Sequence, residues 1–534
     1  MENAALIDEL KSENAVFRAE NSALKSENSA LRSEIAEMQS KLTWIMEQLS
    51  VSKHKMFGAS SEKSVYSQAG LFDDNYQEVQ VINEPASEKK ANRPKKQGEL
   101  SSRLPKDMPV EIIECVLPDD KQNCPDCGGK LHAIGSEVAR RGIRIKPASA
   151  VITEYKRFAY SCRTCDKSSD DKPVPVIKAE LPTQVIKGSM CEPETVAHLI
   201  VQKCVMGSPL HRQEQEWNRI GLQINRQTMA NWLIRCSEDY LEPIYDELRR
   251  KLLHHRFLHS DGTKFQVLRE PGKSPQSQSQ MWIYRTSGDA KHPIVLYDYQ
   301  PDKTKERPKD FLEGFIGYLM TDGCPSYHSL PEDIIVVGCF SHCRRYFVDA
   351  LKTLKEDDRA GSNALIGRQY CDELFRIERE MEVESFEERY TVRNEQAVPV
   401  LREFNNWLMS VQPFIAPKSA TGKAVNYALK QWKYLERYLM DGCIEISNNR
   451  CERSIKPFVI NRKNFLFATS VAGGRAAAVL HSMTETAKDN GLNPFEYLAH
   501  IFRTAAGVSL RENPDVITAL LPENAPPECQ VGDR

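Results

Sequence analysis

Three acidic residues, far apart in the chain, have the chemistry needed to hold metal ions against a phosphodiester. They are Asp261 in the segment HSDGTKFQVL, Asp322 in GYLMTDG and Glu452 in EISNNRCERSIKPF. Carboxylate oxygens are the hard ligands that Mg²⁺ prefers, and Mg²⁺ keeps several waters, so few protein ligands suffice. Two ions about 3.5–4 Å apart can serve the attacking and the leaving oxygen of a phosphoryl transfer. These residues therefore predict a catalytic site for two Mg²⁺ (or Mn²⁺) ions.

Each acid also has a simpler interpretation, because a lone aspartate at a strand end is usually a turn or cap residue. Glu445 competes with Glu452 for the third position. We favour Glu452 because it stands in an NNxxER run with basic residues around it. These basic residues could grip DNA phosphates, or they could form an ordinary solvated face. They are Arg453, Lys456, Arg462 and Lys463.

The segments around the aspartates have the period of strands. Three antiparallel strands are predicted at 256–268, 280–288 and 292–300, followed by a helix at 310–315 and a strand at 317–323. Another helix, a strand at 333–340 and a last helix at 341–354 come next. This order is typical of an RNase-H-like α/β fold. Its first and fourth strands are adjacent, so Asp261 and Asp322 could reach one site. Residues from about 350 to 440 predict a helical insertion before the helix that carries Glu452.

Two C-x-x-C pairs predict a structural zinc ribbon. The four cysteines are Cys124, Cys127, Cys162 and Cys165. Four thiolates on two tight turns suit tetrahedral Zn²⁺, and such a closed site leaves no position for catalysis. Residues 138–160 alternate enough to form a hairpin between the pairs. The alternatives are a redox pair or unliganded buried thiols, and His132 or Cys115 could replace one ligand.

The segment PLHRQEQEWNRIGLQINRQTMANWLIRC has the pattern of a helix-turn-helix. A first helix ends near Gly221, and Asn225 can cap a second helix. This second helix would bury Met229, Trp232 and Leu233. Three outward residues would then be available for DNA, namely Arg226, Gln227 and Asn231. A helical hairpin without a DNA role is the alternative.

The first 50 residues carry a heptad pattern. The d positions are apolar and are Leu10, Phe17, Leu24, Leu31, Met38 and Ile45. Asn14, Asn21 and Asn28 occupy a positions, where buried asparagines favour a fixed register at some cost in stability. The pattern predicts a coiled coil that makes the chain a homo-oligomer, most simply a dimer. One long helix packed on its own protein is the alternative.

The composition is that of a folded multidomain protein. The 534 residues are 40% hydrophobic with a net charge of -2. This net charge by itself argues weakly against nucleic-acid binding. Binding to phosphates, however, needs only local clusters of basic residues. With no apolar run long enough for a membrane span and no signal-peptide pattern, we expect a cytoplasmic, nucleoid-associated protein without a membrane partner.

The patterns together predict eight segments. In order they are a zipper (1–50), a linker (51–110), a zinc module (111–180), a helix-turn-helix-like DNA-binding region (181–252), the first part of a catalytic core (253–348), a helical insertion (349–440), the last part of the core (441–480) and a C-terminal helical tail (481–534).

The motifs in this order resemble transposases of the insertion-sequence-66 family. The resemblance rests on KMFGASSEK, CPDCGG, KCVMGSPLHRQEQEWNRIGLQINRQTMANW, HSDGTKFQVL, GYLMTDGCPSYHSL, GCFSHCRRYF, EISNNRCERSIKPFVINRKNFLF and TETAKDNGLNPFEYL. It implies a DDE transposase that binds element ends and target DNA, cleaves and joins strands, and assigns Asp261, Asp322 and Glu452 as the three acids. Small accessory proteins of the same element are implied as further partners.

The chain departs from the family pattern at three positions, where Gly262, Cys324 and Ser447 replace a glutamate, an aromatic residue and an aspartate. It also contains the family's C-x-x-H element, Cys339 and His342, for which we expect a packed cysteine and a helix-capping histidine. Two other functions stay open. One is an RNase-H-like nuclease or resolvase that does not join strands, and the other is a zinc-dependent DNA-binding protein with a dead core.

Overall fold

The computed structural model describes residues 18, 20–29, 32, 38, 150–156, 158–161, 176–178 and 180–531. The chain forms two compact units, one of which contains Pro182–Gln530 and the other Gln77–Leu181. In the second unit, strand β1 (Ala159–Ser161) pairs antiparallel with β2 (Val176–Lys178). The four cysteines of the predicted zinc ribbon lie outside the described residues, as does most of the hairpin expected at 138–160.

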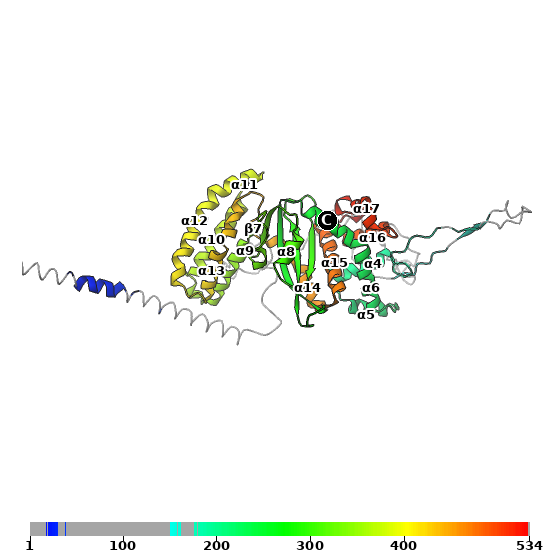
Figure 1. The fold of residues 1–534 in the computed structure, drawn as a ribbon, viewed down its shortest axis with the longest axis horizontal. Helices are drawn as coiled ribbons and strands as arrows, with labels where there is room; N and C mark the ends of the chain where they lie inside the picture. Colours follow the sequence, from blue (N-terminus) through cyan, green and yellow to red (C-terminus); the bar gives the residue numbers. More distant parts are fainter. Residues whose placement is uncertain are drawn as a thin grey trace, which may run out of the picture. The chain divides into compact units, whose positions relative to one another are not determined.

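The larger unit is built on a sheet of six strands (Figure 1). Five of them have the order β5-β4-β3-β6-β7, and the sixth, β8, pairs with β3. Their bounds are β3 Phe257–Arg269, β4 Gln278–Thr286, β5 Val295–Gln300, β6 Gly317–Thr321, β7 Ile334–Gly338 and β8 Phe467–Ser470. The first three strands are antiparallel, and β6 runs parallel to both β3 and β7. The predicted strand order is therefore present, whereas β8 was not predicted.

Two helices from the C-terminal third of the chain pack on the sheet (Figure 1). Helix α14 (Asn449–Phe465) covers one face, and α15 (Val471–Asp489) lies along the edge strand β5. Phe458 of α14 packs edge-on against Phe265 of β3, with ring centroids 5.2 Å apart. Tyr297 of β5 receives a hydrogen bond at its backbone oxygen from Tyr245 and donates from its backbone nitrogen to Ser482 of α15. Because α15 crosses residue 480, the expected boundary between core and tail falls inside a helix that packs on the sheet.

Helices from before and after the core pack around α15. They are α4 (Pro193–Cys204), α6 (Arg226–Cys236), α7 (Glu242–Leu252) and α16 (Pro494–Ala505). Short helices α5 (Leu210–Arg219) and α17 (Pro514–Ala519) complete this part. Helix α8 (Glu306–Phe311) lies on the face of the sheet opposite α14, where Phe311 stacks on Tyr284 of β4. Helix α8 begins and ends four residues before the predicted 310–315. Of the helices that the structure describes, none is both long and apolar enough to cross a membrane.

A helical layer lies beyond β7, where the sequence predicted an insertion (Figure 1). It contains α9 (Phe340–Thr353), α10 (Asn363–Glu380), α11 (Phe386–Val392), α12 (Val398–Val411) and α13 (Ala420–Leu435). These helices share a core of buried aromatic and aliphatic side chains around Phe347 and Phe404, which also includes Met320 and Val337 of the sheet. The insertion is therefore packed directly on the two parallel strands.

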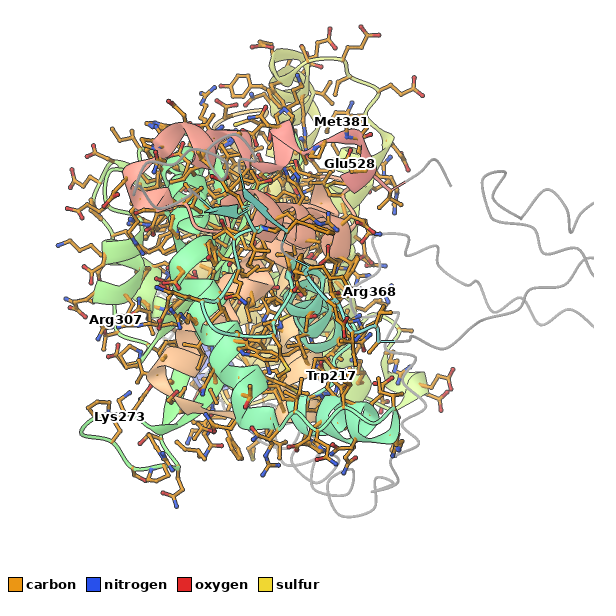
Figure 2. The ribbon with its side chains drawn as sticks, turned by 90° about the vertical axis from the view of Figure 1, so that its right-hand side faces the viewer. Trp217, Lys273, Arg307, Arg368, Met381 and Glu528 are labelled. Carbon is orange, nitrogen blue, oxygen red and sulfur yellow. The ribbon has the colours of Figure 1, made fainter. Side chains whose placement is uncertain are left out.

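The predicted helix-turn-helix is formed by α5 and α6. The side chain of Asn225 caps α6 by accepting a hydrogen bond of 2.9 Å from the backbone nitrogen of Thr228. Trp217 of α5, labelled in Figure 2, is buried together with Met229 and Trp232 of α6. The amphipathic pattern thus predicted the buried face of α6.

Candidate active site

Asp261 and Asp322 lie at the same level of two neighbouring parallel strands. The register of β3 and β6 pairs Leu258 with Leu319 and His259 with Met320. Each aspartate lies two residues beyond the His259–Met320 pair. Since side chains alternate between the faces of a sheet, residues two apart point to the same face. The two carboxylates therefore leave the same end of the same pair of strands, on one face.

The sheet opens beside Asp261. On one edge of β3, β6 pairs as far as His259, and β8 pairs only from Gln266 onward. The described strands leave that edge of β3 open between these two points. Burial follows the same division, because the first four residues of β3 are fully buried and the next three are half-buried. Asp261 is the first residue of the half-buried stretch, at the mouth of the opening.

Glu452 reaches this region from the first turn of α14. Its carboxylate is buried and accepts hydrogen bonds from the guanidinium of Arg345, at 2.9 Å to one oxygen and 3.2 Å to the other. The Nδ1 atom of His342 lies 3.5 Å from the same carboxylate. Both partners come from α9, so the N-terminal turns of α9 and α14 meet at Glu452.

The charges of two other acids act on Asp261. Burial and the charges of Asp322 and Glu452 together raise the pKa of Asp261 to about 7, whereas the hydrogen bond from the backbone N–H of Gly262 and the charge of Lys303 oppose this shift. The proximity of like charges means that the carboxylates favour a proton or a cation among them. Hard oxygen ligands of this kind fit a divalent ion such as Mg²⁺. Lys303, which was not among the residues predicted from the sequence, is a second cation of this region besides Arg345.

Comparison with known proteins identifies the family. The family model described as Transposase IS66 family matches residues 188–476, more than half of the chain. The chain belongs to the IS66 transposase family. The model for the zinc-finger binding domain of transposase IS66 matches residues 121–166, which contain both cysteine pairs. A third model, described as Transposase C of IS166 homeodomain, matches residues 44–113, mainly where a linker was expected.

Two relatives of this transposase come from Sinorhizobium fredii (strain NBRC 101917 / NGR234). The uncharacterized protein y4jD is 30% identical over 434 residues, which cover 79% of this chain and 81% of the relative. The uncharacterized protein y4qI is 28% identical over 463 residues, covering 84% and 81%. No solved structure matches the chain.

Glu445, the competitor for the third acidic position, has other partners in the transposase. It accepts hydrogen bonds from Arg450 (2.8 Å) and from the backbone nitrogen of Gly288 (3.0 Å). His259 Nε2 lies 3.5 Å from the same carboxylate oxygen. Although burial alone would raise the pKa of Glu445, His259 and Arg450 lower it below its usual range. The charge of Glu445 is thus balanced locally.

Asn448, for which the sequence pattern predicted no role, connects the elements that carry Asp261 and Glu452. Its side-chain nitrogen donates to the carbonyl oxygen of Ser260, and its side-chain oxygen lies 2.9 Å from His259 Nδ1. Its backbone nitrogen donates to Cys339 Sγ over 3.1 Å. A buried asparagine before a helix was the available signal, but sequence spacing does not reveal which distant strand it contacts.

The helical insertion supports the loop of Asp322. Tyr427 of α13 donates from its hydroxyl to the carbonyl oxygen of Asp322 over 3.0 Å. The carboxylate of Asp322 accepts from the backbone nitrogen of Cys324, also over 3.0 Å. Gly323, between them, has a φ of +84°, a conformation that favours glycine. The insertion therefore positions one of the three acids as well as enlarging the core.

The residues predicted to contact DNA fall into two groups. On α6, Arg226, Gln227 and Asn231 are exposed, and Gln227 donates to the Asn231 side chain over 3.0 Å. On α14, Lys463 is exposed, while Arg453, Lys456 and Arg462 are half-buried. Arg462 donates to the hydroxyl of Thr263, two residues beyond Asp261 on β3. This bond places one basic residue of α14 close to the strand of the acidic group.

The C-x-x-H element differs from expectation in one respect. Cys339 is fully buried, as expected, and is the N-cap residue of α9. His342 lies in the first turn, and no side chain caps this helix by a hydrogen bond. The expectation of a helix-capping histidine was therefore wrong, because the ring faces Glu452 of α14 instead.

Proposed function

We propose that this transposase cleaves DNA at element ends and joins the freed ends to target DNA, with Asp261, Asp322 and Glu452 as the metal-binding acids. The observation that carries the proposal is the convergence of three carboxylates from β3, the end of β6 and α14, where the charges of Asp322 and Glu452 both act on Asp261. Carboxylates that lie close enough for their charges to interact in a half-buried opening provide the ligands that a pair of Mg²⁺ or Mn²⁺ ions requires.

The topology supports an RNase-H-like core. Three antiparallel strands are followed by two parallel strands that add to the far edge of the first, giving the order β5-β4-β3-β6-β7. We propose that β3 to β7, α9, α14 and α15 form this core, with α10 to α13 inserted before the helix of the third acid. The two cysteine pairs would hold one structural Zn²⁺ through four thiolates.

In this proposal, the protein contributes positioning and charge. Asp261, Asp322 and Glu452 fix the ligand oxygens, and Asn448 and Tyr427 hold the segments that carry them. When bound, the two divalent ions activate the attacking oxygen and neutralise charge on the leaving oxygen. Arg453, Lys456, Arg462 and Lys463 bind the phosphates that flank the cut. Arg226, Gln227 and Asn231 of α6 contact the bases of the element end.

Replacing Asp261 by asparagine tests the assignment. The amide keeps the size of the side chain but loses the charge, so we expect Asp261→Asn to bind labelled element ends normally and to lose cleavage by about three orders of magnitude or more. Asp310→Asn is the matched control, because Asp310 is exposed in α8. Cleavage by Asp261→Asn at the wild-type rate would refute the metal site.

The products separate the proposed function from its alternatives. Labelled ends mixed with target DNA and Mg²⁺ should yield joined products as well as cut ends. Cleavage without joined products, under conditions in which the wild-type protein assembles on both ends, would identify a nuclease or resolvase. Binding without any metal-dependent nicking would identify a DNA-binding protein with a dead core.

A further inference from the structure

A cysteine and a histidine lie against the carboxylate of Glu452. The possible ligand atoms of Cys339, His342 and Glu452 all lie within 4.8 Å of one another. Cys339 and Glu452 are buried, and His342 is half-buried. Sulfur, imidazole nitrogen and carboxylate oxygen form a mixed donor set of the kind that Zn²⁺ accepts, whereas Mg²⁺ prefers oxygen alone.

The sulfur of Cys339 lies in surroundings that stabilise a thiolate once a cation is present. It accepts a hydrogen bond of 3.1 Å from the backbone nitrogen of Asn448. The backbone N–H groups of Ser341 and His342 also favour its charged form, since the sulfur lies at the N-terminus of α9. Burial nevertheless raises the pKa of the thiol to about 12. The free protein therefore holds a neutral thiol, and a bound metal ion would release its proton.

The imidazole of His342 offers a ring nitrogen to a metal ion. Its Nδ1 atom is buried and, among the residues described, has no hydrogen-bond partner. This nitrogen lies 3.5 Å from Glu452 Oε1, and the other ring nitrogen lies 3.4 Å from Arg345. A buried polar atom without a partner is costly, and a metal ion would satisfy it.

We propose that Cys339, His342 and Glu452 form a second zinc site, separate from the cysteine pairs, and that zinc bound there withdraws Glu452 from the catalytic acids. Zinc binding at this site needs only the three ligands. The inhibitory effect rests on the proposed function, because it makes zinc an inhibitor of Mg²⁺-dependent cleavage. Zinc bonds of about 2.0–2.3 Å require the three ligand atoms to approach slightly closer than they do in the free protein.

Arg345 opposes zinc binding. Its guanidinium occupies both oxygens of Glu452, and it places a positive charge beside the site. Arg345 is half-buried on the same helix as His342, so it can turn toward solvent when the metal ion takes over the carboxylate. Removing this cation should therefore strengthen zinc binding, an effect that is opposite in sign to the loss of a ligand.

Metal content of the full-length protein tests the site without any measurement of activity. We expect about two tightly held zinc ions per chain, one on the cysteine pairs and one here. Cys339→Ser and His342→Gln should each reduce the content to about one zinc ion per chain. Arg345→Gln should keep both ions and raise the affinity of the ion at Cys339, His342 and Glu452 by about tenfold or more. Cys343→Ser is the matched control, because Cys343 is a buried cysteine of the same helix that is outside the ligand group.

Cobalt provides a second readout for the same proteins. Co²⁺ bound through a thiolate gives a sulfur-to-metal charge-transfer band. Because Cys339 supplies one of five thiolates at the two sites, Cys339→Ser should lose about one fifth of the intensity while Cys343→Ser keeps it. Circular dichroism establishes whether each variant is folded. If Cys339→Ser does not fold, His342→Gln replaces it as the variant that lacks one ligand. Wild-type protein with a single zinc ion that is unaffected by His342→Gln, Cys339→Ser or Arg345→Gln would overturn the proposal.

Cleavage measured at fixed Mg²⁺ and increasing Zn²⁺ then tests the inhibitory role. As the zinc concentration rises, the cleavage rate of the wild type should fall relative to its rate without zinc. For His342→Gln the same fall should require about tenfold more zinc. Two bound zinc ions in a protein that never cleaves DNA would support the metal site and contradict the proposed function. Cleavage that is insensitive to zinc, with the second ion bound, would contradict the inhibitory role alone.

Discussion

The side-chain nitrogen of Asn448 donates a hydrogen bond of 2.9 Å to the carbonyl oxygen of Ser260. Ser260 immediately precedes Asp261, and Asn448 immediately precedes the helix that begins at Asn449 and carries Glu452. This one side chain therefore couples the position of the strand that bears the first acid to that of the helix that bears the third. Asn448 is fully buried and also contacts His259, so both ends of its amide are satisfied.

Asn448→Ala should weaken Mg²⁺ binding by the three acids while the protein stays folded. The substitution leaves the carbonyl of Ser260 and the ring of His259 without this partner, which costs about 1–3 kcal/mol of stability. We expect cleavage to fall by about ten- to a hundredfold, with a higher Mg²⁺ concentration needed for half-maximal rate. Asn394→Ala, at an exposed asparagine, is the control. An unchanged Mg²⁺ dependence would show that Asn448 stabilises the fold without positioning the acids.

The raised pKa of Asp261 predicts how stability depends on pH without divalent ions. Because the folded pKa is about 7 and the ordinary value is 3.8, the folded protein binds the proton more tightly than the unfolded chain. The free energy of unfolding should therefore fall as pH rises from about 4 to about 7 and should stop falling above that range. Urea unfolding of wild type and Asp261→Asn at several pH values measures this contribution. If the free energy of unfolding changed with pH in the same way for the wild type and for Asp261→Asn, a raised pKa of Asp261 would be contradicted.

The same pKa predicts that metal binding releases a proton. The acids must be ionised to bind Mg²⁺, so the apparent Mg²⁺ affinity should rise by up to about tenfold per pH unit below pH 7 and level off above it. Calorimetry in buffers with different ionisation enthalpies counts the released protons. Equal heats in all buffers at pH 6 would mean that Asp261 is already ionised in the metal-free protein.

The heptad pattern predicts self-association through the N-terminal helix. Residues 20–29 are helical, and Leu24 and Met38, both at d positions, are exposed. Leu24→Asp should shift the protein toward monomer in light scattering, as should removal of residues 1–50. Ser22→Asp introduces the same charge at an outward b position of the same turn and should leave the oligomeric state unchanged. A dimer that survives both the substitution and the truncation would place the interface elsewhere.

The exposed face of α6 predicts base-specific recognition of element ends. Asn231→Ala should weaken binding to end DNA by about 1–3 kcal/mol while binding to unrelated DNA stays the same. Arg235→Ala is the control, since Arg235 is exposed in the last turn of the same helix and pairs with Asp239. Lys463→Ala should weaken both kinds of DNA equally and reduce the salt dependence of binding. Equal losses on both DNAs for Asn231→Ala would assign α6 to backbone contacts.

Local patterns in the sequence determined much of the architecture. The alternation of apolar residues predicted the strands from 256 to 340 in their observed order, and Asn225 caps α6 where the helix-turn-helix pattern placed a cap. The two cysteine pairs fall within the segment that matches the family's zinc-finger model. These features are set by neighbours a few residues apart, whose spacing reports the period of a helix, strand or turn.

Only the tertiary structure brought together residues that are far apart in the chain. Strand β8 has four residues, too few to show a period, and it exists because it pairs with β3 about 200 residues earlier. The contacts of His342 and Arg345 with Glu452, and of Asn448 with Ser260, depend on how α9, α14 and β3 pack. Packing of this kind depends on which surfaces meet after the elements have formed, and spacing along the chain carries no record of it.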